Sequence, residues 1–183
     1  MIGPAGLAAT SPLLAWRDPI YVLAGFAGII AMALMLAQPL LAGGYLPGLN
    51  LLQSRRTHRM LGVALVLLVA LHVVGLWITS PPDVIDALTF TSPTPFSVWG
   101  VIGMWAIFVS ALTVVLRRRL RLAPPTWPRV HKAFAVLIVT STALHALQII
   151  GAMEPISKAL LSGLIFAVTI GVILRRPRPQ RSR

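Results

Sequence analysis

Four histidines are the residues of this sequence whose type and spacing could do chemistry. They are His58, His72, His131 and His145, and the chain has no others. His58 and His72 lie 14 residues apart, and so do His131 and His145. In an α-helix, 14 residues come within about 40° of four full turns and advance about 21 Å. Each pair therefore lies on one helix face at two depths, and neutral imidazole is the commonest metal ligand among side chains.

Membrane-spanning helices are the elements that must position these histidines. The chain has 183 residues, of which 57% are hydrophobic and 11% are charged. A soluble domain carries about 25% charged residues and could not bury so much apolar surface in one core. Five apolar stretches are long enough to cross a hydrocarbon layer of about 30 Å. We expect these spans at residues 19–38, 57–79, 98–116, 128–150 and 157–174.

The charged residues predict the orientation of the spans. Of the 16 Lys and Arg residues, 14 lie in or directly beside the segment between the first two spans, the segment between the third and fourth, or the segment after the fifth. Five spans place all three segments on one side, and the positive-inside rule makes that side cytoplasmic. The four acidic residues fall on the other side. We predict an outward N-terminal surface segment (1–18), a transmembrane domain (19–174) and a basic cytoplasmic tail (175–183), with the lipid bilayer rather than nucleic acid as partner.

The second and fourth spans run parallel because one helix separates them. His58 then shares one depth with His131, and His72 shares another with His145. Each level presents two imidazoles across a gap, and helical bundles build cofactor sites from such inward-facing side chains. An iron with a histidine on both sides is coordinatively full and suits electron transfer. We therefore predict an all-α integral membrane bundle of five helices with two haems between the second and fourth helices.

Missing residue types exclude other chemistries. The chain has no cysteine, which excludes disulfides, thiolate zinc sites, iron–sulfur clusters and covalent haem attachment, so the expected haems are non-covalent b haems. No Asp or Glu falls inside an expected span, which disfavours a proton relay or an ion transporter. A dinucleotide or Walker motif is also absent.

The two levels differ in their expected surroundings. Near the inner level, five basic residues are expected to pair with haem propionates. These residues are Arg55, Arg56, Arg59, Arg129 and Lys132. Near the outer level, the haem propionates are expected to bind Gln148, Lys158 or water. Between the levels, Leu65 and Ile138 form an apolar layer.

Small and aromatic residues near the ligands leave two interpretations open. Gly62 and Gly75 follow the histidines of the second span, where they either clear room for a macrocycle or let helices pack closely. Trp127 is expected in an interfacial aromatic belt. Trp105 lies deeper and packs either on a cofactor or on a helix.

The segments around the histidines resemble the ferric-reductase-like transmembrane family. This family includes eukaryotic ferric reductases, NADPH oxidases and the bacterial haem subunit of the periplasmic methionine sulfoxide reductase system. The resemblance spans residues 19–174 and is carried by R-R-T-H-R-M-L-G with His58 and His72, and by W-P-R-V-H-K with His131 and His145. The outer loop from Ser80 to Gly100 looks like that of stand-alone bacterial members.

The resemblance implies that His58 with His131 and His72 with His145 ligate two b haems in a bacterial cytoplasmic membrane. Electrons would pass to an outer-face acceptor such as ferric iron, oxygen or a periplasmic redox enzyme. The sequence ends where oxidase-type relatives continue into flavin and nicotinamide domains, and it lacks the sixth, N-terminal helix of many relatives. The expected donor is therefore a separate protein or a quinol, and no motif supports a flavin. The alternative function is an accessory haem-bearing subunit of a larger membrane complex.

Overall fold

The structure is a computed structural model that describes residues 6, 8–117, 119–121, 123 and 125–175. In this part of the chain it contains helices and no strand. The elements are a 3-10 turn (Pro12–Leu14), α2 (Pro19–Ala42), α3 (Leu51–Thr79), α4 (Pro81–Leu88), α5 (Pro95–Leu116), α6 (Thr126–Gln148) and α7 (Pro155–Leu174). All but α4 and the 3-10 turn are long and apolar enough to cross a membrane, which makes five candidate spans. The predicted all-helical class and the five apolar spans are therefore confirmed.

The structure differs most from the predicted boundaries in three places, and the other helix ends lie within three residues of the prediction. Helix α2 continues past Pro39 to Ala42, because a proline removes only its own N–H and this loss is tolerated in membrane helices. Helix α3 begins at Leu51 rather than at residue 57, because Asn50 and Gln53 form a reciprocal capping box. The segment expected to be an outer loop contains α4, which begins with two prolines suited to a first helical turn.

Carboxylates start two of the long helices. The side chain of Asp18 accepts hydrogen bonds from the backbone N–H groups of Ile20 and Tyr21 at the start of α2. Glu154 does the same for Ile156 and Ser157 at the start of α7. These hydrogen bonds lower the pKa of Glu154 below its ordinary value. Two of the four acids therefore serve as N-caps.

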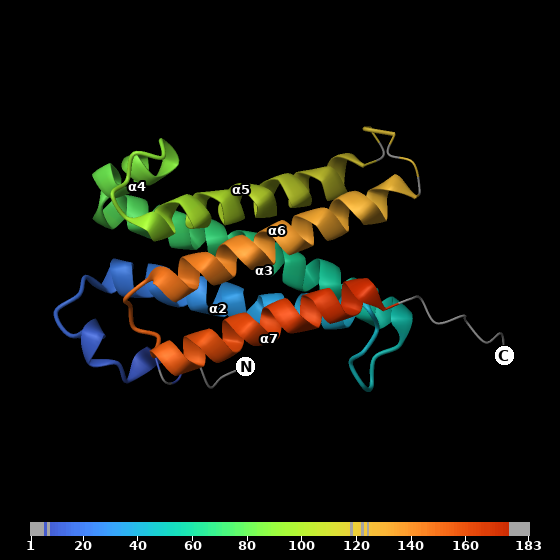
Figure 1. Cartoon of the computed structure of the whole chain (residues 1–183), viewed down its shortest axis with the longest axis horizontal. Helices are drawn as coiled ribbons and strands as arrows, with labels where there is room; N and C mark the ends of the chain where they lie inside the picture. Colours follow the sequence, from blue (N-terminus) through green and yellow to red (C-terminus); the bar gives the residue numbers. More distant parts are fainter. Residues whose placement is uncertain (1–5, 7, 118, 122, 124, 176–183) are drawn as a thin grey trace.

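The long helices lie side by side, and α4 lies at one end of the bundle near the start of α5 (Figure 1). Helix α2 packs mainly on α3 and α7, whereas α6 packs mainly on α5 and α7. The histidine-bearing helices α3 and α6 make few close backbone contacts with each other in the described part of the chain. The bundle is therefore two helical hairpins, α2–α3 and α5–α6, with α7 packed against both.

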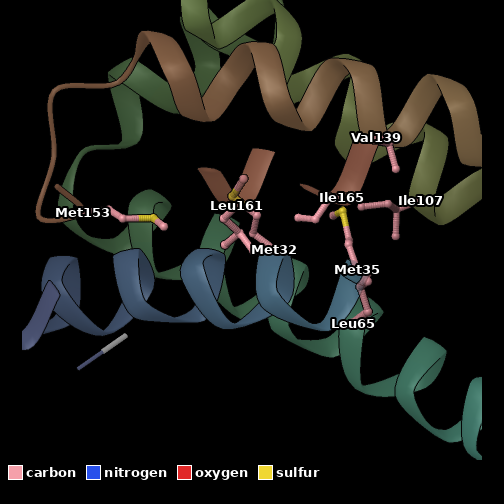
Figure 2. Packing of buried hydrophobic residues seen from close by; sticks show 8 residues of the cluster. All are labelled: Met32, Met35, Leu65, Ile107, Val139, Met153, Leu161 and Ile165. Carbon is pink, nitrogen blue, oxygen red and sulfur yellow. The ribbon is translucent and has the colours of Figure 1, made fainter. Parts of the chain in front are cut away.

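A buried apolar cluster draws residues from all five long helices. Its members are Met32, Met35, Leu65, Ile107, Val139, Met153, Leu161 and Ile165. In Figure 2 the labelled side chains gather between α2 and α6. Leu65 lies seven residues from each histidine of α3, so this part of the core lies midway between the two histidine depths.

Candidate functional site

The structure brings the four histidines together in two pairs across the space between α3 and α6. The ring centroids of His58 and His131 lie 6.2 Å apart, with an interplanar angle of 78°. Those of His72 and His145 lie 6.5 Å apart, at 80°. We call the first pair the inner level and the second the outer level. The levels therefore pair the residues that the 14-residue spacing predicted.

One nitrogen of each histidine ring is held by a neighbouring helix. The Nδ1 atoms of His58, His72 and His145 lie 3.1, 2.7 and 2.8 Å from the backbone carbonyl oxygens of Gln38, Ala24 and Phe96. In the described part of the chain, Nε2 of these rings makes no hydrogen bond. Metal-ligating histidines commonly donate their second N–H to a backbone carbonyl, which fixes the tautomer and orients the ring. The arrangement leaves Nε2 available as a ligand.

His131 is held differently. Its Nδ1 lies 3.3 Å from the hydroxyl oxygen of Ser110, a buried residue of α5. Its ring also stacks on Trp127, at 5.3 Å between centroids and 25° between planes. Trp127 was expected only in the interfacial belt, and Ser110 was not singled out by the sequence.

Two glycines that sequence reasoning missed make room for the outer-level rings. A Cβ at Gly100 of α5 would come within 2.7 Å of both Nδ1 and Cε1 of His145. A Cβ at Gly28 of α2 would come within 3.1 Å of Nδ1 of His72. Each glycine therefore lets a backbone approach the edge of a histidine ring.

The supporting residues recur at a constant offset between the two hairpins. Each of three supporting residues in the first hairpin has a counterpart 72 positions later, whereas the histidines are offset by 73. The pairs are Ala24 and Phe96, Gly28 and Gly100, and Gln38 and Ser110. The supporting positions of the two hairpins thus correspond, but only Gly28 and Gly100 share a residue type, so the sequence alone does not reveal the correspondence.

Of the two glycines singled out from the sequence, the structure gives one a role in helix packing. A Cβ at Gly75 would come within 2.7 Å of the Cβ of Ala24, so Gly75 allows α2 and α3 to approach closely. A Cβ at Gly62 would lie 3.7 Å from the side-chain nitrogen of Gln38. The amide of Gln38 is buried without a hydrogen-bond partner in the described part of the chain. Trp105 packs edge-on against Phe108 of its own helix and is 54% exposed.

The predicted propionate partners take different positions. The five basic residues Arg55, Arg56, Arg59, Arg129 and Lys132 are all exposed. They lie within four residues of an inner-level histidine on the same helix. Gln148 is half-buried, three residues after His145. Lys158 is buried, and its ammonium donates to the backbone carbonyl of Ile149. The basic tail, apart from Arg175, lies outside the described residues.

The donor set decides what each level can hold. The described residues contain no group of three or more His, Cys, Asp or Glu side chains suited to a metal ion. A bare ion would therefore have only two side-chain ligands at each level, too few for the usual four- to six-coordinate sites. Two imidazoles on opposite sides of one metal, with bonds of about 2.0–2.1 Å, have ring centroids roughly 6.4 Å apart. Both levels match this spacing, which fits a metal whose remaining ligands come from a planar macrocycle.

One of three comparisons with known proteins found a match. A family model described as ferric reductase like transmembrane component matches residues 16–142. The match runs from the start of α2 into α6 and includes His58, His72 and His131, and it ends three residues before His145. No curated protein and no solved structure matches the chain.

Proposed function

The chain belongs to the ferric reductase-like transmembrane component family, and from this premise we propose that it is a di-haem b-type cytochrome. The family implies transmembrane electron transfer in general, and its members typically bind haem. We propose one haem at the inner level and one at the outer level. Electrons would pass between a donor and an acceptor at opposite ends of the bundle. The donor would bind at the basic end, which carries Arg55, Arg129 and the other basic residues near the inner level.

The observation that carries this proposal is the pair of opposed imidazoles at each of two depths. Nε2 of His58 and His131 would hold one iron, and Nε2 of His72 and His145 the other. The Nδ1 hydrogen bonds keep each ring in the orientation and tautomer that a ligand needs. A bound haem supplies a one-electron ferric–ferrous couple.

Other residues have supporting roles in this proposal. Arg55, Arg56, Arg59, Arg129 and Lys132 surround the inner level and would attract its propionates. Gln148 and Lys158 are the corresponding candidates at the outer level. Leu65 and Ile138 pack in the apolar layer between the levels, where they exclude water and mobile protons.

The orientation and partners follow from the charges. We propose that the basic end faces the cytoplasm of a bacterial inner membrane, as the positive-inside rule favours. The donor would be a cytoplasmic redox protein or a membrane quinol. The acceptor would bind at the end that carries α4, whose Asp83 and Asp86 would attract a cationic or iron-bearing species.

The test is a haem count and a reduced-minus-oxidised spectrum of the purified protein. The wild type is expected to hold two b haems per chain. His58→Ala and His131→Ala should each remove the same spectral component, and His72→Ala and His145→Ala the other. Met60→Ala is a control on α3, because this side chain is 63% exposed. A protein without haem, or a single haem indifferent to two of the histidines, would overturn the proposal.

A further inference from the structure

Ser110 is the one supporting residue that departs from the repeat between the hairpins. Its counterpart Gln38 offers a backbone carbonyl to His58, as Ala24 and Phe96 do to the outer-level histidines. Ser110 instead meets His131 through its side-chain hydroxyl. Three ligand contacts are therefore independent of side-chain identity, and the fourth depends on one serine.

Ligation defines the direction of this hydrogen bond. When Nε2 of a neutral histidine binds a metal, Nδ1 carries the proton and must donate. At Ser110 the acceptor is then the hydroxyl oxygen. A hydroxyl is a weaker acceptor than an amide carbonyl, and the 3.3 Å contact is the longest of the four. A weaker hydrogen bond raises the basicity of the imidazole less, so it stabilises the ferric state less.

Trp127 fixes the ring independently of Ser110. The indole stacks on the His131 ring from one turn earlier on α6. The Ser110 hydroxyl, by contrast, reaches the edge of this ring from α5. Removal of the hydroxyl should therefore change how strongly His131 donates electrons to the metal, while the stack with Trp127 keeps the imidazole ring in its orientation.

We propose that Ser110 is a positioning residue that sets the midpoint potential of the inner level through Nδ1 of His131. The proposal rests on the function proposed above. The midpoint potential of the inner level would then depend on one side chain. The outer level has no equivalent residue, because backbone carbonyls make both of its Nδ1 contacts.

The experiment is a potentiometric titration of the purified protein that follows both haem components optically. Ser110→Ala removes the acceptor and should raise the midpoint potential of the component that His131→Ala removes. Ser110→Asn supplies an amide carbonyl and should lower it. Ser110→Thr keeps the hydroxyl and should leave it unshifted. The outer component should not move in any of these variants.

Ser141→Ala is the matched control, because this serine is also buried but its hydroxyl donates only within its own helix, to the carbonyls of Leu137 and Ile138. It should shift neither component. An inner potential that stays unchanged in Ser110→Ala and Ser110→Asn would overturn the inference, and so would an equal shift of both components. If Ser110→Ala fails to load the inner level, Ser110→Thr must load it, and failure of both would also overturn the inference. Absence of haem from the wild type would instead refute the proposed function.

Discussion

The inner and outer levels use the same arrangement of two opposed histidines, but the histidines are held in different ways. At the outer level, short contacts of 2.7 and 2.8 Å join Nδ1 to backbone carbonyls, and two glycines admit the ring edges. At the inner level, the contacts are 3.1 and 3.3 Å, and one of them comes from a side chain. Both outer-level contacts are therefore set by the paths of the helices, whereas one of the two inner-level contacts depends on the identity of a single side chain.

Gly100→Ala should break the outer level alone and has the largest expected effect. The new Cβ would lie 2.7 Å from two atoms of His145, closer than real side chains approach, so the ring must leave its position. We expect loss of most of the outer haem and retention of the inner haem, measured by haem content per chain. Gly163→Ala is the control, because nothing lies within 4 Å of its added Cβ. Equal haem loss in both variants, or loss from the inner level, would contradict this prediction.

Leu65→Ala tests whether the apolar layer between the two levels contributes equally to haem binding at both. This side chain is 7% exposed within the apolar cluster, and truncation of a buried leucine costs about 2–5 kcal/mol. We expect this loss in the free energy of unfolding, with both haems still bound. Leu67→Ala, on the same helix but 58% exposed, should cost much less. Selective loss of one haem would mean that the layer belongs to one level.

Gly28→Ala should strain the outer level without removing its haem. The added Cβ would lie 3.1 Å from Nδ1 of His72, so the ring must move by only a few tenths of an ångström. We expect a cost near the lower end of the roughly 1–3 kcal/mol typical of overpacking, measured by thermal unfolding. The outer midpoint potential should shift while the inner one stays. Gly25→Ala, with nothing within 4 Å, should be neutral or slightly stabilising, and an equal loss there would refute the steric explanation.

Glu154→Gln has the smallest expected effect, a weaker dependence of protein stability on acidic pH. Glu154 caps α7 at the end of the bundle nearer the outer level. Backbone and side-chain hydrogen bonds from Ser157 and Ile156 lower its pKa. A lowered pKa in the folded state stabilises the protein above the ordinary glutamate pKa, and this contribution is lost as the pH falls through the lowered value. Thermal unfolding between about pH 3 and 6 should therefore depend less on pH in Glu154→Gln. Identical pH profiles for the two proteins would count against this role.

Local sequence signals predicted the five spans and the histidine pairing. Hydropathy located the spans, and a spacing of nearly four helical turns placed each histidine pair on one face. The residues that hold the rings could not be found this way. Gly28 lies 44 residues before His72, and Gly100 lies 45 residues before His145, so their roles depend on how neighbouring helices pack. Helix α4 was missed because its eight residues are too few to register as a hydropathy signal.

The depth difference between the levels also determines how the protein would respond to a transmembrane voltage. The levels are separated by about 21 Å along the helices, roughly two-thirds of a 30 Å hydrocarbon layer. One electron that passes between them would therefore cross about two-thirds of the transmembrane voltage, worth about 1.5 kcal/mol at 100 mV. Residues 60–71 and 133–144 contain no ionisable side chain, so neither α3 nor α6 offers a side-chain path for a proton to follow this electron. The transfer would be electrogenic, and a voltage of fixed sign would favour one direction of flow.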